Sequence, residues 1–223
     1  MVDDELRAKR DALEYLWRQG LSGQPLLHRH SQLIDDYRRA CGSVPVAQLV
    51  FVQCECDPAQ SEQEVAWVSE VAARDPRIRG IVAQAPLEKG DAVEATLVRL
   101  AANPLVKGVR RLLQAEADEA FCLRPDFVRA VKRLPHFGLS FDICIFQKQL
   151  ASVIRLVRQC PQVRFVLDHA GKPGIRAGLL EPWRTELKEL AALPNVACKL
   201  SGLATEADPA KWTPADLRPY IDH

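Results

Sequence analysis

The sequence predicts an α/β protein with a parallel sheet, either an open doubly wound sheet or a closed barrel. Two observations indicate this class: short apolar runs alternate with segments of helical periodicity, and each run is too short for a typical helix. Polar residues also gather where the apolar runs end. In both architectures functional groups lie at the carboxyl ends of the strands, because the loops that follow open there above a packed core.

Six apolar runs are predicted strands, since most are rich in β-branched residues or phenylalanine. In chain order they are residues 46–54, 78–85, 106–113, 139–145, 163–169 and 196–201. The segments between them repeat apolar residues with helical spacing, which predicts helices over residues 31–41, 61–74, 92–102, 125–134, 147–160 and 182–193.

Several helix ends carry local signals. Ser61 with Glu64 three residues later fits a capping box, and Pro182 fits the first turn of a helix. A residue that precedes proline disfavours the helical conformation, so we expect helices to stop at Asp75-Pro76, Asn103-Pro104, Cys160-Pro161 and Leu193-Pro194. We find no linker, low-complexity tract or fixed repeat and therefore expect residues 1–223 to form a single domain.

The charge balance points to a small-molecule substrate. The chain has 30 Lys and Arg against 29 Asp and Glu, a formal net charge of +1, which provides no global field for nucleic acid or an anionic membrane.

The cysteines and the first residues indicate a reduced, cytoplasmic setting. The seven cysteines are odd in number, and Cys54 and Cys56 form a C-x-C without the spacing of zinc or redox motifs. The chain is charged from Asp3, so it lacks the apolar region of a signal peptide, and no apolar run approaches membrane-spanning length.

His169 is the sharpest candidate for chemistry. Alternation along residues 163–169 places Phe165, Leu167 and His169 on one face and Val166 and Asp168 on the other, so one of Asp168 and His169 should face the centre. Histidine titrates near neutral pH and can shuttle a proton or ligate a metal. A histidine hydrogen-bonded in a loop explains the pattern equally well.

Lys172 follows in AGKPG, where flanking glycines allow a tight turn and close approach to a ligand. Its ammonium could pair with a substrate carboxylate or a lactone oxygen. A phosphate-binding P-loop is excluded, because Pro173 stands where Ser or Thr is needed and Val166 where glycine is needed.

Three further charged residues end strands. Arg110 and Arg111 are neighbours, so only one can point inward, and a guanidinium there suits a carboxylate; the other is a surface ion pair. Asp142 lies among apolar residues, where a carboxylate needs a partner, so it belongs to the site or serves as a structural acceptor. His28-Arg29-His30 imitates a metal-binding pair, but it follows no strand and is interpreted as a loop.

Taken together the motifs resemble one family, the amidohydrolase-related hydrolases that include L-fuconolactonase and pyrone dicarboxylate lactonase. The matching pieces occur in order across most of the chain: DDYRRA (35–40), LVFVQCECDP (49–58), KGVRRLLQ (107–114), SFDIC (140–144), FVLDHAGKP (165–173), NVACKLSGL (195–203) and WTPADLRPY (212–220). DHAGKP and KLSGL in this order are the most specific.

The resemblance implies a (β/α)8 barrel that hydrolyses a small sugar-derived or carboxylated lactone, with a role in carbohydrate metabolism. It matches His169 to a histidine of the family's site and places Lys172, Arg110 and Gln53 in motifs that hold the family's polar pocket residues. With the polar strand ends, this leads us to predict catalytic roles for His169, Lys172 and Asp142. We predict substrate contacts from Arg110, Gln53 and Ser201. The resemblance also implies either no cofactor or a single divalent metal, zinc being possible, with His169 as a ligand.

The sequence departs from the family pattern in two places. The family has an H-x-H pair on its first strand and an aspartate that activates water on its last, and the sequence matches neither. We therefore expect an incomplete barrel with about six of eight β/α units, truncated or altered at both ends. Its uncovered strand edges would favour self-association.

Three functions remain open from the sequence. The first is a lactone hydrolase, the second a metal-dependent decarboxylase of the same fold, and the third a non-catalytic remnant that binds small carboxylates.

Overall fold

The computed structural model describes residues 34–35, 37–39 and 41–223 and divides the chain into two compact units, Met1–Val46 and Ala47–His223. In the first unit the described residues 34–35, 37–39 and 41 are helical, and Arg38 forms an ion pair with Asp35 at 2.8 Å. His28 and His30 lie outside the described residues. The expected single domain over residues 1–223 stays a prediction.

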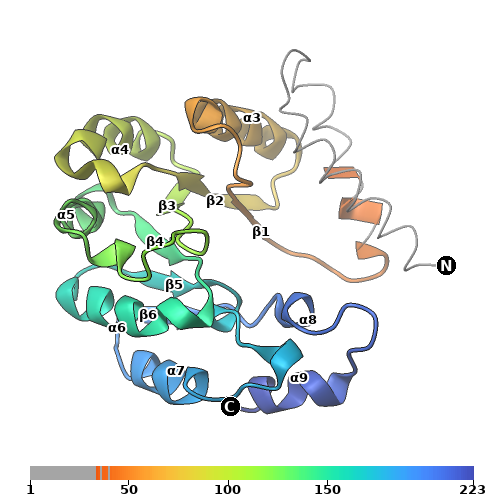
Figure 1. Cartoon of the computed structure of the whole chain (residues 1–223). Coiled ribbons are helices and arrows are strands. Elements are labelled where there is room, and N and C mark those ends of the chain that lie inside the picture. Colours follow the sequence, from red (N-terminus) through yellow and green to blue (C-terminus); the bar gives the residue numbers. More distant parts are fainter. Residues whose placement is uncertain (1–33, 36, 40) are drawn as a thin grey trace. The chain divides into compact units, whose positions relative to one another are not determined.

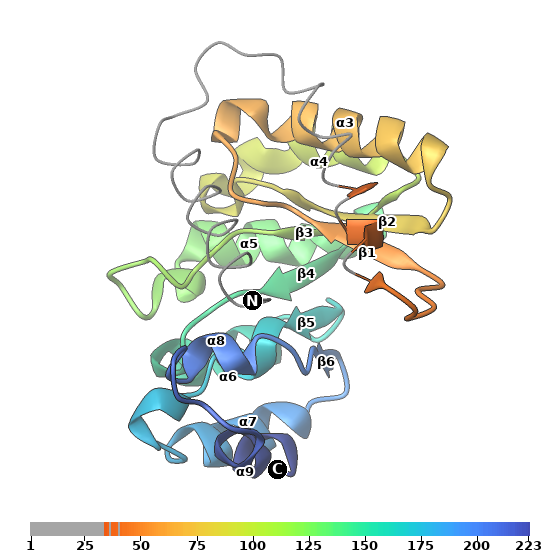
Figure 2. The ribbon, with the colours of Figure 1, turned by 90° about the vertical axis from the view of Figure 1, so that its right-hand side faces the viewer.

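The second unit is built on six parallel strands that follow one another in chain order (Figure 2). They are β1 (Leu49–Val52), β2 (Ile78–Gln84), β3 (Val106–Arg110), β4 (Ser140–Ile143), β5 (Phe165–Leu167) and β6 (Val196–Cys198). Each strand pairs only with its chain neighbours, so the sheet is open within the described residues. The predicted fold class, an incomplete barrel of about six β/α units, is confirmed.

Helices cover the outer face of this curved sheet (Figure 1). The larger ones are α3 (Ser61–Arg74), α4 (Glu94–Ala101), α5 (Pro125–Arg133), α6 (Leu150–Gln159) and α7 (Trp183–Ala191), one after each of β1 to β5. Two more, α8 (Leu203–Glu206) and α9 (Pro214–Ile221), follow β6. Short 3-10 turns lie between these elements: Pro58–Gln60, Leu87–Val93, Phe121–Leu123, Leu134–Phe137, Gln147–Gln149, Asp168–Gly171 and Ile175–Ala177.

The core lies between the outer sheet face and the helices. Phe141 of β4 packs edge to face on Phe127 of α5 at 5.8 Å and on Phe165 of β5 at 6.1 Å, and all three side chains are buried. Because side chains alternate along a strand, the residues next to Phe141 in β4 and next to Phe165 in β5 point to the opposite, inner face. Asp142 follows Phe141, so the aromatic ladder fixes which face carries the polar residues.

The predicted capping box at the start of α3 is wrong. The helix begins at Ser61 with Gln60 as N-cap, and the Ser61 hydroxyl donates to the Pro58 carbonyl. Glu64 accepts a hydrogen bond from the Cys54 amide at 3.1 Å instead, which ties the helix to the chain just beyond β1. Glu64 therefore accepts from a residue outside the helix instead of from the backbone at the helix N-terminus.

None of the described helices combines the length and the apolar character needed to cross a membrane.

Candidate functional site

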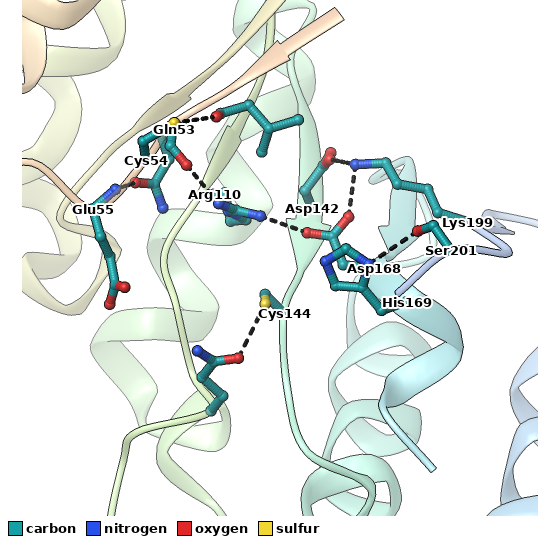
Figure 3. A network of polar contacts seen from close by, with 12 residues as sticks. Gln53, Cys54, Glu55, Arg110, Asp142, Cys144, Asp168, His169, Lys199 and Ser201 are labelled. Atoms are coloured by element: carbon teal, nitrogen blue, oxygen red, sulfur yellow. Dashed lines mark hydrogen bonds and ion pairs between the residues drawn. The ribbon is translucent and has the colours of Figure 1, made fainter. Parts of the chain in front are cut away.

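A chain of charged side chains crosses the inner face at the carboxyl ends of the strands (Figure 3). Strand register explains this arrangement: Arg110 is paired with Asp142, Asp142 with Val166, and Val166 with Ala197. Asp168 and Lys199 stand two residues after Val166 and Ala197, just beyond the ends of β5 and β6. With a period of two, these side chains share one face. Four strands thus contribute to one polar layer.

Lys199 is the centre of this layer. Its ammonium donates to Asp142 Oδ2 at 2.5 Å and to Asp168 Oδ1 at 2.6 Å, and both carboxylates are almost fully buried. Burial alone would lower the pKa of Lys199, but the two aspartates raise it above its usual value. Burial raises the pKa of Asp142 although Lys199 hydrogen-bonds to it.

Arg110 extends the chain toward β1. It donates to Asp168 Oδ2 at 2.9 Å and to the backbone carbonyl of Gln53 at 2.5 Å (Figure 3). Gln53 is buried, and its side-chain oxygen accepts from the Glu55 amide at 2.6 Å. Arg111 points elsewhere, to Glu88 and Glu116, as expected for neighbouring residues on a strand. Both terminal nitrogens of Arg110 are therefore engaged by the protein.

His169 departs from the alternation predicted for its strand. β5 ends at Leu167, and residues 169–172 all have positive φ: 55° at His169, 51° at Ala170, 71° at Gly171 and 51° at Lys172. Because the backbone turns here, both Asp168 and His169 lie at the site, whereas alternation predicted only one. Left-handed non-glycine residues cost about 1–3 kcal/mol each and cluster at functional sites. The surrounding contacts must offset this cost.

Tertiary contacts hold the left-handed run in place. The Ala170 amide donates to the Lys199 carbonyl at 3.1 Å, and the indole of Trp183 donates to the Ala170 carbonyl at 2.7 Å. Both partners come from later segments, α7 and β6, so the turn depends on the folded sheet.

The imidazole of His169 rests on the KLSGL segment. Its Nδ1 lies 2.9 Å from Ser201 Oγ, and a Cβ on Gly202 would come within 2.7 Å of the same nitrogen. Only glycine leaves room for the ring, and Gly202 also has a positive φ of 66°. Burial lowers the pKa of His169, and the nearby cations Lys172, Arg110 and Lys199 lower it further against the opposing effect of Asp168. The imidazole is accordingly neutral at pH 7.

Lys172 takes part in no carboxylate pair within the described residues. Its ammonium donates to Gln114 Oε1 and lies 5.1 Å from the centre of the Phe146 ring. It is half-buried, and its amide donates to the His169 carbonyl at 2.9 Å. The site thus holds a neutral imidazole next to the ammonium of Lys172.

The described residues do not fit a metal site by themselves. No group of three His, Cys, Asp or Glu side chains converges among them. The two buried aspartates are occupied by Lys199, and His169 uses one ring nitrogen on Ser201. A metal held here would need ligands from beyond the described part of the chain.

Sequence reasoning missed two residues of this site. Lys199 lies within the predicted strand 196–201, but nothing in one sequence indicates which carboxylates an ammonium will meet across two strands. Gln114 is only the last residue of the KGVRRLLQ motif. Its spacing from Lys172 in the chain is large, so only the fold brings them together.

Comparison with known proteins assigns the chain to a family. The sequence profile of the amidohydrolase family matches residues 30–223. The chain belongs to this family. The amidohydrolase is 36% identical over 149 residues to an L-fucono-1,5-lactonase of Burkholderia ambifaria, which covers 67% of this chain and 51% of that protein. It is 32% identical over 206 residues to an L-fucono-1,5-lactonase of Burkholderia multivorans, covering 89% and 69% respectively.

A solved structure supports the same assignment. The crystal structure of an amidohydrolase from Burkholderia multivorans with bound zinc superposes with a TM-score of 0.74 at 33% identity, over 84% of this chain and 66% of that one. The chain spans about half the length of the first relative and 66% of the solved structure.

Proposed function

We propose that this amidohydrolase hydrolyses a small lactone, either sugar-derived or carboxylated. The observation that carries the proposal is the left-handed run at residues 169–172, which brings a neutral imidazole and an ammonium together at the carboxyl end of β5. The names of the two lactonase relatives support the reaction class.

Hydrolysis of a lactone adds water to the carbonyl carbon and then breaks the ring C–O bond, giving a hydroxy acid. Negative charge develops on the carbonyl oxygen, so positioned N–H donors lower the barrier. When the Ser201 hydroxyl donates to Nδ1 of His169, Nε2 carries the hydrogen and can donate to that oxygen. Lys172 would hold the substrate from the other side.

Water also loses a proton as it adds to the carbonyl carbon, and in the proposed step a solvent water accepts that proton. Asp142, which the sequence suggested as catalytic, does not fit that role, because its carboxylate is buried and hydrogen-bonded to Lys199. The same holds for Asp168. We assign both to the framework that supports His169, with Arg110 and Gln53 as further parts of that framework rather than as free substrate ligands.

A divalent metal, if this protein binds one, would supply Lewis-acid polarisation of the carbonyl or a water of lowered pKa. The described residues do not form such a site by themselves.

The test follows proton release by the purified chain on neutral sugar 1,5-lactones and on a pyrone dicarboxylate, with and without zinc. We expect turnover, and we expect His169→Ala to reduce it at least a hundredfold. His136→Ala, which changes an exposed histidine 33 residues earlier in the chain, should leave turnover unchanged. Release of CO₂ that depends on zinc would support the decarboxylase instead. Ligand binding without turnover by folded protein would support a non-catalytic binding protein.

A further inference from the structure

Three loops meet around Lys172 and are joined by glutamines. The Gly174 amide donates to Gln147 Oε1 at 2.8 Å, and Gln149 donates from Nε2 to the Leu113 carbonyl at 2.6 Å while its Oε1 accepts from the Phe146 amide. Gln149 is buried. The loops that carry Lys172, Phe146 and Gln114 therefore form one connected wall beside His169.

The carboxamide of Gln114 has a defined orientation. Its Oε1 accepts from the Lys172 ammonium and from Cys144 Sγ at 3.4 Å, and its backbone amide donates to the Cys144 carbonyl at 3.1 Å. Both sets of contacts place the carbonyl end of the amide toward the protein. Within the described residues, the Nε2 donors make no hydrogen bond and remain available to a ligand.

Phe146 adds an apolar surface to the same wall. Its side chain is 39% exposed although it is a large aromatic residue, and the Lys172 ammonium lies over its ring. A partly exposed aromatic ring next to two sets of N–H donors is suited to a ligand ring that carries C–H groups on its face and hydroxyls on its rim.

The charges near this wall disfavour a substrate with two carboxylates. Among the described residues, four cations lie at or just beyond the ends of β3, β5 and β6. Three of them bind carboxylates: Arg110 binds Asp168, Arg111 binds Glu88 and Glu116, and Lys199 binds Asp142 and Asp168. Lys172 makes no such pair with a described carboxylate. Glu55 is exposed at the same edge and adds a negative charge (Figure 3). Among these described cations, a dianion would therefore meet one ammonium without a carboxylate partner, which is too few for two carboxylates.

We propose that Gln114, Phe146 and Lys172 form a subsite for a neutral polyhydroxylated ring, so that the enzyme selects sugar lactones over lactone dicarboxylates. Lys172 and the Gln114 amide donate to ring hydroxyls, and Phe146 packs against the ring face. The subsite rests on the proposed function in one respect, which is that the ligand ring lies beside His169.

Binding of unreactive probes tests this subsite apart from catalysis. Calorimetric titration of the full chain with 1,5-anhydroglucitol, a neutral cyclic polyol without a carbonyl, is compared with isophthalate, a six-membered ring with two carboxylates. We expect the polyol to bind at least tenfold more tightly. Three variants should each weaken binding of the polyol by at least tenfold: Lys172→Met, Gln114→Leu and Phe146→Leu. Lys188→Met, which changes an exposed lysine of α7, should leave this binding unchanged.

Each other outcome overturns the subsite. Tighter binding of isophthalate that Lys172→Met abolishes would assign Lys172 to an anion. Binding of neither probe by folded protein, or polyol binding that the three variants leave unchanged, would place the ligand elsewhere. Lactone turnover is measured on the same samples. Polyol binding that the variants weaken, without turnover, would reject the hydrolase and keep the subsite. Turnover without such binding would keep the hydrolase and reject the subsite.

Discussion

At the scale of single residues, the environment of His169 decides its protonation. Its pKa lies below the ordinary 6.5 because the ring is partly buried and three cations lie near it. The folded state therefore binds the proton less tightly than the unfolded chain, and His169 favours unfolding as the pH falls below about 6.5. The neutral form is the one present in the native protein at pH 7.

Removal of one of these cations should move the pKa of His169 in a known direction. We expect Lys172→Met to raise it toward 6.5, because a like charge that disfavours the imidazolium is lost. Titration of the imidazole resonances by NMR measures the change, with Lys188→Met as the control. An unchanged midpoint in Lys172→Met would mean that the two side chains are too far apart to interact.

Lys199 should matter for stability because it neutralises two buried carboxylates. Removal of one partner from a fully buried ion pair costs about 3–5 kcal/mol. The side chain of Lys199 is 34% exposed, so solvent screening reduces the expected loss for Lys199→Met to roughly 2 kcal/mol. Urea unfolding at pH 7.5 measures this, beside Lys188→Met.

The stability that Lys199→Met loses should also depend on pH. Burial already raises the pKa of Asp142, and loss of the Lys199 hydrogen bond raises it further. A group whose folded pKa is raised contributes stability that is full at low pH and is lost as the pH rises. The difference in unfolding free energy between wild type and Lys199→Met should thus be smaller at about pH 5 than at pH 7.5. A difference independent of pH would assign the loss to packing of the lysine stem.

At the scale of elements, Glu64 links α3 to the end of β1. Burial raises the pKa of this carboxyl, although its hydrogen bond from the Cys54 amide acts in the opposite direction. Glutamine keeps an acceptor for that amide and removes the buried charge. The hydrogen bond therefore makes the link, and the burial of the carboxylate charge is the unfavourable part of the interaction.

We expect wild type to lose stability relative to Glu64→Gln as the pH rises above about 4.5, because a raised folded pKa contributes stability only at lower pH. Urea unfolding at pH 5 and pH 8 measures the trend. Glu70→Gln, an exposed carboxylate on the same helix, should show no such trend. Equal stability of wild type and Glu64→Gln at both pH values would mean that water reaches the carboxylate.

At the scale of the whole molecule, strand β6 at one edge of the sheet leaves apolar surface uncovered in the described part of the chain. There β6 pairs only with β5, Ala197 and Cys198 are exposed, and Leu200 just beyond is 61% exposed. Unpaired strand edges provide a template for another chain.

The protein should therefore self-associate as its concentration rises through the micromolar range, and Leu200→Lys should weaken this association. Sedimentation velocity over a concentration series measures it. Val98→Lys changes another exposed apolar residue, which lies on α4, and serves as the control. A monomer at every concentration, or the same effect from both variants, would contradict the prediction.

The sequence by itself determined the order of the strands and helices, the parallel sheet and the segments that carry the site. Apolar periodicity records which residues are buried, and helix α3 was predicted to the residue because its pattern is long and ends before a proline. Polar residues at strand ends marked His169, Asp142 and Arg110, since such positions meet at one edge of any parallel sheet.

Only the tertiary structure decided what each of these groups does. Alternation could not predict that both Asp168 and His169 reach the site, because the left-handed run that begins at His169 is held by Trp183 and by the backbone of Lys199. Nor could it predict that Lys199 occupies both aspartates, or that Gln114 holds Lys172. These partners are remote in sequence, and their meeting depends on strand register and loop packing, which arise only when the whole sheet has formed.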